Sequence, residues 1–156
     1  LNEYLQFASS QSEEVTETFD ISELIKNLVE KYQNTKITLD LAKRVYMDGR
    51  KNLIKRCLNN LIDNGIKYAE NIHIHLIKSQ NHIIITIDDD GPGIQKKDYD
   101  NVFKPFFKVD KSRGGSKSSV GLGLSIASDV IKSHGGNINL DKSPQKGLRV
   151  KIFFPF

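Results

Sequence analysis

Two asparagines and a lysine recur along one predicted helix at a spacing that could serve phosphate chemistry. Asn60, Asn64 and Lys67 fall at positions i, i+4 and i+7, so a helix places them on one narrow face. Asparagine is a poor helix former, and two of them one turn apart need a reason. An amide oxygen can complete the coordination shell of a hard cation such as Mg²⁺, and an ammonium group can meet phosphate oxygens. A solvated helix face accounts for the same spacing equally well.

A carboxylate and two glycines follow directly after a predicted strand. In the segment 89–94 (Asp-Asp-Gly-Pro-Gly-Ile), Asp89 could accept a hydrogen bond from an exocyclic amine. Gly91 and Gly93 would let the backbone approach a ligand closely and adopt a positive φ. An ordinary turn rich in Asp, Gly and Pro is the alternative, and it is the better interpretation of this segment taken alone.

Two glycines also open the last predicted helix. Gly121 and Gly123 alternate with leucines there, and Ser119 lies shortly before them. Free amide groups at a helix N-terminus bind anions, and glycines give access to those groups. The alternative is a plain helix N-terminus capped by a serine.

Aromatic and basic residues alternate between these two glycine motifs. The segment 103–108 reads Phe-Lys-Pro-Phe-Phe-Lys, and Lys111 and Arg113 follow it. Such a mixture could stack on nucleic-acid bases. It could equally form a lid that packs by its rings and offers its cations to a polyphosphate.

The elements that must position these motifs form one α+β pattern. Hydrophobic periodicity and turn residues predict helices over 1–12, 21–32, 49–68 and 121–133, and strands over 36–41, 45–47, 72–78, 82–88, 137–141 and 147–154. Asp20 and Asp48 are the predicted N-caps, with Glu23 completing a capping box after Asp20. We expect a two-layer α/β sandwich, in which one mixed, mostly antiparallel sheet carries helices on one face.

Composition bounds the class of protein. With 156 residues, of which 38% are hydrophobic and 27% charged, the chain can form one packed domain. A net charge of +4 fits an anionic ligand as well as it fits nucleic acid. The single cysteine, Cys57, excludes an internal disulfide and is expected to be a small buried hydrophobe. The longest apolar run, 83–85, is far too short for a membrane span, so we expect a soluble, cytoplasmic fragment.

The order of the four motifs resembles the N, G1, F and G2 boxes of the histidine kinase catalytic domain. Residues 60–68 (Asn-Leu-Ile-Asp-Asn-Gly-Ile-Lys-Tyr) are similar to the N box, and the stretch from Gly135 to Gly147 resembles the closing segment. That domain has the Bergerat (GHKL) ATP-binding fold, which is shared with gyrase, the Hsp90 chaperone and MutL-type ATPases. The resemblance covers nearly the whole chain and implies that it binds ATP with Mg²⁺.

The resemblance also implies a role for each matching residue. Asn64 would be the metal ligand, coordinating a Mg²⁺ ion that bridges the ATP phosphates, and Asp89 would accept the adenine amino group. The implied catalytic residues are Asn60, Asn64, Lys67, Lys108 and Arg113, of which the last two could reach the γ-phosphate. The implied nucleotide-binding residues are Asn60, Asn64, Lys67, Tyr68, Asp89, Gly91, Gly93, Ile94, Phe103, Ser119, Val120, Gly121, Leu122, Gly123 and Leu124.

One position distinguishes a kinase from a hydrolase. In the ATP-hydrolysing relatives, a glutamate one helical turn before the Mg²⁺-binding asparagine activates water, whereas this chain has Asn60 there. A neutral amide is no useful general base at physiological pH. The site is therefore suited to hold ATP until a histidine attacks the γ-phosphoryl group. A GHKL-type ATPase, a degenerate nucleotide-binding regulatory module and a nucleic-acid-binding module are the alternatives.

The resemblance divides the chain and predicts its partners. Residues 1–12 look like the end of a dimerisation helix, as in osmosensor-type kinases, 13–19 form a linker and 20–156 the catalytic domain. None of the four histidines has the context of an acceptor, and we expect them at the surface or at strand edges. The implied partners are the histidine-phosphotransfer/dimerisation domain of the same parent kinase and a response regulator, with no nucleic acid. The parent would be a membrane-anchored homodimer in the bacterial inner membrane, and the fragment a monomer.

The chain departs from the family pattern at two positions. Ser119 stands where the G2 box most often has glycine, and Leu148 stands where the closing segment usually has threonine. The first change would stiffen the lid and weaken ATP binding, and the second would matter less.

Overall fold

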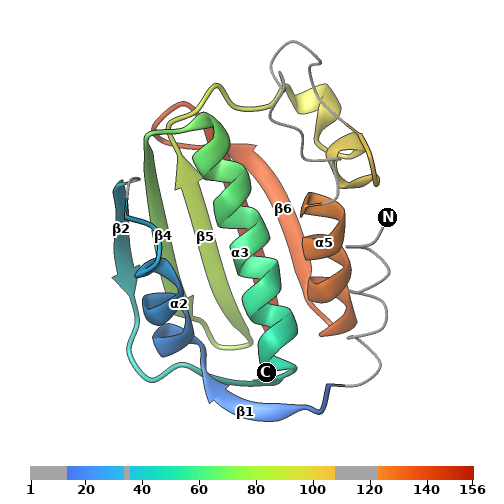
Figure 1. Ribbon diagram of the computed structural model, residues 1–156. Coiled ribbons are helices and arrows are strands. Elements are labelled where there is room, and N and C mark those ends of the chain that lie inside the picture. Colours follow the sequence, from blue (N-terminus) through green and yellow to red (C-terminus); the bar gives the residue numbers. More distant parts are fainter. Residues whose placement is uncertain (1–13, 34–35, 108–122) are drawn as a thin grey trace.

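Three helices lie on one face of a five-stranded sheet in the computed structural model, which describes residues 14–33, 36–107 and 123–156 (Figure 1). The elements are β1 (Glu17–Asp20), α2 (Ile21–Val29), β2 (Lys36–Leu41), β3 (Tyr46–Gly49), α3 (Lys51–Tyr68), β4 (Asn71–Lys78), β5 (His82–Asp89), the short 3-10 turns η1 (Lys96–Asp98) and η2 (Asn101–Phe103), α5 (Gly123–Ser133), β6 (Asn137–Lys142) and β7 (Leu148–Pro155). The predicted two-layer α+β sandwich is confirmed.

The main sheet is mixed and mostly antiparallel, as expected. Its strand order is β2-β4-β5-β7-β6. The β4–β5 and β6–β7 pairs are the predicted hairpins, and β5 pairs antiparallel with β7 between them. Strand β2 runs parallel to β4, and a parallel pair requires a crossover, which here contains α3.

The core lies between the sheet and α3. Alternate residues of each strand face the helices, so that Ile72, Ile74 and Leu76 of β4 are 1–2% exposed. The predicted apolar stripe of α3 packs against them and is buried: Leu53, Ile54, Cys57, Leu58, Leu61 and Ile62. The Cys57 thiol lies 3.6 Å from the carbonyl oxygen of Ala127, and burial raises its pKa, as expected for an inert core thiol.

The start of α3 corrects the sequence analysis. Asp48 was predicted to cap this helix, but it belongs to β3 and accepts a hydrogen bond from Thr18. Strand β3 pairs antiparallel with β1, a strand that the sequence analysis did not predict within the expected linker. The helix therefore begins at Lys51, and the Glu14 carboxylate accepts hydrogen bonds from the backbone N–H groups of Asn52 (2.7 Å) and Leu53 (3.1 Å).

The first described helix keeps its predicted cap and is shorter than predicted. Asp20 Oδ1 accepts hydrogen bonds from the N–H groups of Ser22 (2.9 Å) and Glu23 (3.3 Å). The helix ends at Val29 instead of Tyr32. Tyr32 lies beyond the helix, and its hydroxyl donates a hydrogen bond to Asp63 on α3 at 2.8 Å.

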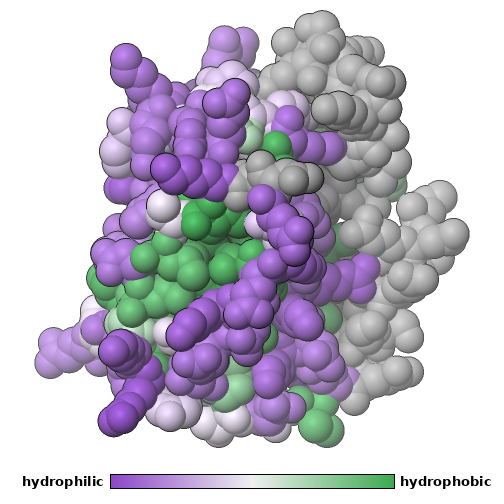
Figure 2. All heavy atoms as spheres, turned by 60° about the vertical axis from the view of Figure 1, so that its left-hand side comes forward, coloured by the Kyte–Doolittle hydropathy of each residue, from purple (hydrophilic) through white to green (hydrophobic). Residues whose placement is uncertain are grey.

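Strand β2 forms an edge of the sheet and leaves part of its apolar side uncovered. Leu39 is 36% exposed, and Ile37 and Leu41 are half-buried. Figure 2 turns this side of the molecule toward the viewer and shows an apolar area between hydrophilic residues. Among the described helices, none has both the length and the apolar content needed to cross a membrane. The predicted helix over 1–12 and the predicted helix start at Gly121 lie outside the described residues.

Candidate functional site

The last turns of α3 meet the end of β5 at a buried glycine. A Cβ atom on Gly65 would lie 3.1 Å from Ile72 Cδ1 and 3.8 Å from Asp89 Oδ2. The absence of a side chain at Gly65 therefore lets the Asp89 carboxylate approach the helix. Gly65 and Asp89, which lie 24 positions apart in the sequence, are neighbours in the fold for this reason.

The α3 residues with predicted roles occupy its C-terminal half. Asn60, Asn64, Lys67 and Tyr68 are all half-buried there, at the border of the apolar stripe. The Asn60 side-chain nitrogen is buried, and within the described part of the chain it has no hydrogen-bond partner. An unpaired buried amide is costly, so a ligand acceptor at this point would stabilise it.

The first turn of α5 lies beside the same part of α3. A Cβ atom on Gly123 would lie 3.9 Å from the Asn60 carbonyl oxygen, and Leu124 is 9% exposed in the core. The structure thus brings Gly123 next to the backbone of Asn60. Six predicted site residues lie outside the described ranges: Lys108, Arg113, Ser119, Val120, Gly121 and Leu122.

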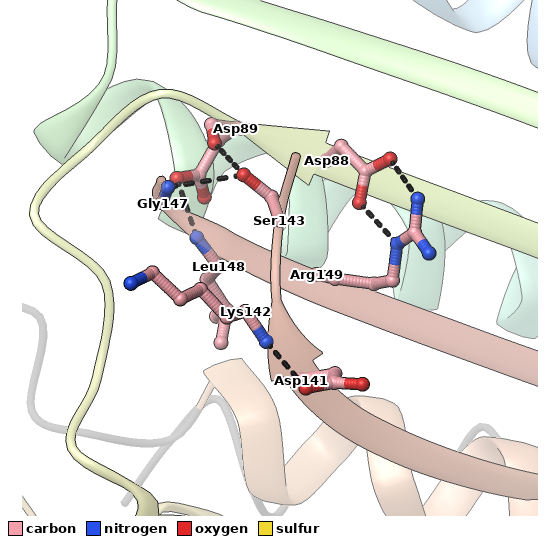
Figure 3. Close-up of polar contacts among 8 residues, drawn as sticks. All are labelled: Asp88, Asp89, Asp141, Lys142, Ser143, Gly147, Leu148 and Arg149. Atoms are coloured by element: carbon pink, nitrogen blue, oxygen red, sulfur yellow. Dashed lines mark hydrogen bonds and ion pairs between the residues drawn. The ribbon is translucent and has the colours of Figure 1, made fainter. Parts of the chain in front are cut away.

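The Asp89 carboxylate is held in one orientation by backbone donors (Figure 3). Its Oδ1 atom accepts hydrogen bonds from the N–H groups of Gly91 (3.0 Å) and Leu148 (3.1 Å). With Oδ1 engaged in this way, Oδ2 is the oxygen on the α3 side, near Gly65. A fixed carboxylate oxygen is a suitable acceptor for an amino group that approaches between α3 and β5.

The turn between β6 and β7 supports Asp89 from the other side. Ser143 is 5% exposed, and its hydroxyl donates to the Asp89 carbonyl oxygen at 2.6 Å. The same hydroxyl accepts from the Gly147 N–H at 3.0 Å. A Cβ atom on Gly147 would lie 2.2 Å from both the carbonyl oxygen and Oδ1 of Asp89, so only glycine fits. No pattern in the sequence indicated a role for Ser143.

Leu148 takes part in the site through its backbone. Its N–H bonds Asp89, while its side chain is 6% exposed in the core. A backbone N–H is present with leucine as it would be with threonine. The departure from the family pattern at this position therefore leaves the Asp89 contact in place.

The glycines after β5 are needed where they stand. A Cβ atom on Gly91 would lie 3.0 Å from the Tyr68 carbonyl oxygen, so this loop passes close to the end of α3. Gly93 has φ +73°, a left-handed conformation that favours glycine. Ile94 and Phe103, two further predicted site residues, are partly buried against the core.

Asp90 fastens the same loop to the turn between α3 and β4, a contact that the sequence did not reveal. Its Oδ1 accepts from the N–H groups of Glu70 (2.9 Å) and Asn71 (3.0 Å), and its Oδ2 accepts from the Asn71 amide at 2.7 Å. These hydrogen bonds lower the pKa of the Asp90 carboxyl. Asp90 thereby holds the loop that follows Asp89 against the start of β4.

The neighbouring acid, Asp88, points to the opposite face of the sheet. It is 4% exposed and forms a bidentate ion pair with Arg149, at 2.8 and 2.9 Å (Figure 3). The hydrogen bond to Asp88 raises the pKa of Arg149. This pair joins β5 to β7 and takes no part in the site.

The histidines occupy structural positions. His73 bonds Thr38 at 2.8 Å, and His75 lies 3.6 Å from Asp40, both on the open face of the sheet. His134 was expected at the surface, but it is half-buried between α5 and α3, where it contacts the Val130 carbonyl oxygen (2.7 Å) and accepts from the Arg50 N–H (3.0 Å). Within the described ranges, no group of three or more His, Cys, Asp or Glu residues is suited to hold a metal.

Comparison with known proteins identifies similar domains. Residues 49–156 match the family described as "Histidine kinase-, DNA gyrase B-, and HSP90-like ATPase". The chain is 34% identical to the sensor histidine kinase CpxA of Escherichia coli K12 over 108 residues, which are 69% of this chain and 24% of that protein. It is 34% identical to the signal transduction histidine-protein kinase ArlS of Staphylococcus epidermidis over 93% of this chain and 33% of that protein.

A solved structure agrees with the fold over most of the chain. The mycobacterial sensor histidine kinase MprB superposes with a TM-score of 0.79 at 25% identity, covering 90% of this chain and 97% of that one. The chain thus corresponds to about a quarter to a third of the curated relatives' length and to nearly all of the structure solved for MprB.

Proposed function

Because the chain belongs to the family of histidine kinase-, DNA gyrase B- and HSP90-like ATPases, we propose that it is the ATP-binding catalytic domain of a sensor histidine kinase. The observation that carries the proposal is the meeting of Asp89 with α3 at Gly65. It places an oriented carboxylate next to the helix that bears both asparagines. One ligand with a base at one end and phosphates at the other would contact both.

The base side of the proposed site consists of Asp89, Gly91, Ser143 and Gly147. Asp89 Oδ2 would accept the adenine amino group, and Gly91 and Gly93 would leave room for the ring. Support comes from the two backbone N–H groups that hold Oδ1, because they orient the carboxylate with Oδ2 toward Gly65 of α3. Tyr68, Ile94 and Phe103 would line the pocket around the base.

The phosphate side consists of Asn60, Asn64, Lys67 and Gly123. These residues fit a Mg²⁺-bound polyphosphate, since the buried Asn60 amide nitrogen has no partner in the described ranges and Asn64 follows one helical turn later. When bound, Mg²⁺ would neutralise charge on the phosphates. Asn64 would hold the ion, Asn60 would contact it or a phosphate oxygen, and Lys67 would meet a phosphate. From outside the described residues, Lys108 and Arg113 would add cations, and Ser119, Val120, Gly121 and Leu122 would complete the lid side.

The proposed reaction is phosphoryl transfer to a histidine. Asn60 cannot take a proton from water at neutral pH, so the site holds ATP without a base for hydrolysis. The protein residues then act by orienting the triphosphate and stabilising its charge. The acceptor would lie on a separate histidine-phosphotransfer/dimerisation domain of the same parent, and a response regulator aspartate would receive the phosphoryl group next. The parent would be a homodimer anchored in the bacterial inner membrane, with this domain on the cytoplasmic side.

A reconstitution experiment tests the proposal. The domain is mixed with its dimerisation domain and with ATP labelled at the γ-phosphate. We expect acid-labile, base-stable label on the dimerisation domain. Asn64→Ala should abolish Mg²⁺-dependent ATP binding, whereas Asn52→Ala, a matched change at the exposed start of α3, should leave it intact.

Two outcomes would contradict the proposal. If the wild-type domain binds no nucleotide, the assignment of the site is wrong. If the domain alone hydrolyses ATP steadily and labels no partner, it belongs with the hydrolases of the family, and Asn60 does not have the role given to it.

A further inference from the structure

Asp89 stands at a point where the regular pairing of the sheet has ended on one side. The β5–β7 register ends at the pair Asp88–Arg149, although Asp89 still pairs with Ile72 of β4. Its carbonyl oxygen is therefore beyond the last backbone pair with β7. The hydroxyl of Ser143 reaches this oxygen at 2.6 Å and replaces the missing ladder contact with a side-chain contact.

The same hydroxyl also shapes the turn that carries Leu148. Ser143 accepts from the Gly147 N–H through its hydroxyl (3.0 Å), and its own N–H donates to the Gly147 carbonyl oxygen (2.9 Å). The Lys146 N–H closes the turn on the Ser143 carbonyl oxygen at 3.0 Å. One buried hydroxyl thus joins Asp89 to the residue directly before the Leu148 N–H, which is a donor to Asp89 Oδ1.

We propose that Ser143 is a positioning residue for base selectivity, which orients the Asp89 carboxylate by holding the β6–β7 turn against it. The inference rests on the nucleotide-binding function proposed above. Ser143 is buried, and its hydroxyl contacts the backbone of Asp89 and Gly147, so in this proposal it does not touch the nucleotide. It acts because the Leu148 N–H and the Gly91 N–H together hold Oδ1, and the position of the first of these donors depends on the turn. Figure 3 shows Ser143, Gly147 and Leu148 gathered around Asp89.

Removal of the hydroxyl would take a hydrogen-bond partner from two backbone groups, one buried and one partly buried. The Gly147 N–H and the Asp89 carbonyl oxygen would both lose this partner, in a region where Gly147 is itself buried. The turn would move away from Asp89, and the carboxylate would gain freedom to rotate. Recognition of an amino group would suffer from this rotation, while contacts to the phosphates on α3 would remain.

The test compares two nucleotides that differ at the atom facing Asp89. ATP carries an amino group at purine position 6, and ITP carries an oxygen there. Ser143→Ala should weaken ATP binding about tenfold and ITP binding less than about twofold, so the preference for ATP falls. Gln145→Ala, an exposed change in the same turn, should leave both affinities and their ratio unchanged. Equal weakening of both nucleotides, together with a lower melting temperature, would show a purely structural role and overturn the proposal.

Two further variants cover the case in which Ser143→Ala folds poorly. Ser143→Cys keeps the size of the side chain but replaces a strong donor with a weak one, and it should show the same fall in the ATP:ITP ratio. Ser143→Thr keeps a hydroxyl and should restore the ratio even if the added methyl group lowers stability. In an Asp89→Asn background, Ser143→Ala should have almost no further effect on ATP affinity. A full additional loss there would exclude action through Asp89.

A measurement without nucleotide separates this inference from the proposed function. Amide hydrogen exchange at Gly147, Leu148 and Gly91 should be about tenfold faster in Ser143→Ala than in Gln145→Ala. Unchanged exchange at Leu148 would overturn the role of Ser143, even if the domain binds ATP. Faster exchange in a domain that binds no ATP would instead support the role of Ser143 in holding the β6–β7 turn and refute the proposed function.

Discussion

The two sides of the proposed site differ in how complete their contacts are. On the base side, Asp89 Oδ1 has two backbone donors and the Asp89 carbonyl oxygen has the Ser143 hydroxyl. On the phosphate side, the Asn60 amide nitrogen is buried and lacks a partner among the described residues. The contacts on the first side come from the fold itself, whereas the Asn60 amide on the second side would gain a partner if the proposed ligand binds.

This difference predicts opposite effects of mutation. A base-side change that breaks one of these contacts should damage both the fold and binding, because the same contacts serve both, whereas a base-side change that keeps them should affect binding alone. A change at Asn60 should damage binding alone, because the unpaired amide already costs stability.

Gly147→Ala should have the largest effect. The added Cβ would lie 2.2 Å from two Asp89 atoms, so the turn or the strand must move. We expect a loss of about 3 kcal/mol in unfolding free energy and more than about a hundredfold in ATP affinity. Denaturant unfolding and calorimetric titration measure the two. Gly123→Ala is the stability control, since its Cβ would lie 3.9 Å from Asn60 O, an ordinary contact. Wild-type stability in Gly147→Ala would mean that the turn is not packed against Asp89.

Asp89→Asn should separate recognition from folding. The asparagine oxygen can still accept from the Gly91 and Leu148 N–H groups, but a donor NH₂ replaces Oδ2. ATP affinity should fall by about thirtyfold to a hundredfold, and ITP should gain relative to ATP. The melting temperature should change little. If ATP and ITP lose affinity equally, the carboxylate does not contact the base.

Asn60→Ala should weaken the phosphate side without loss of stability. The variant removes a buried donor for which the described part of the chain supplies no partner, so the unfolding free energy should stay within about 1 kcal/mol of wild type or rise. Affinity for Mg²⁺-ATP should fall about tenfold, with little change for adenosine, which has no phosphates. A clear drop in stability would show that the amide has a partner in the folded domain.

Acidification should produce the smallest effect, and at a third location. Burial lowers the pKa of His134, and the nearby Arg50 charge lowers it further, although the bond to Val130 and the Glu14 charge oppose the shift. The unfolded chain therefore binds a proton more readily than the folded one. The stability contributed by neutral His134 is fully present above the ordinary histidine pKa of about 6.5. It is lost as pH falls below that value toward the lowered pKa of the folded state.

The expected loss between pH 7.5 and 5.5 is about 1 kcal/mol or less. Protonation places a second donor opposite the Arg50 N–H, which removes the 3.0 Å contact. Thermal unfolding across this range measures the slope, and His134→Gln should flatten it. An unchanged slope in the variant would assign the pH dependence to other groups.

The sequence was sufficient for the architecture because helix and strand periodicities are local. The apolar stripe of α3 and the alternation in β4 and β5 predicted the core and both hairpins. Strand β1 and the true start of α3 were missed because both depend on partners far along the chain. Glu14 caps a helix 38 residues away, which no local pattern indicates.

The sequence predicted the motifs of the site separately, but it did not predict the distances between them. Asp89 and the asparagines could be proposed because carboxylates and amides signal chemistry wherever they occur. Ser143 and Asp90 could not, because a serine before Pro and an aspartate in a Gly-Pro turn are common turn residues. Their function depends on contacts with Asp89 and Asn71 that only the fold creates.

The strand order has a consequence for how the chain acquires its fold. Strand β7 lies between β5 and β6, and the pair Asp88–Arg149 joins residues 61 positions apart. The β4–β5 hairpin needs only local contacts and can form early, whereas β5 keeps one unpaired edge until β7 arrives. During synthesis from the N-terminus, this edge of β5 stays unpaired until β7 has been made. We expect the nascent domain to be most prone to edge-to-edge aggregation during this interval. The contacts of Asp89 with Leu148 and Ser143 need β7 and the turn before it, so they are among the last to form.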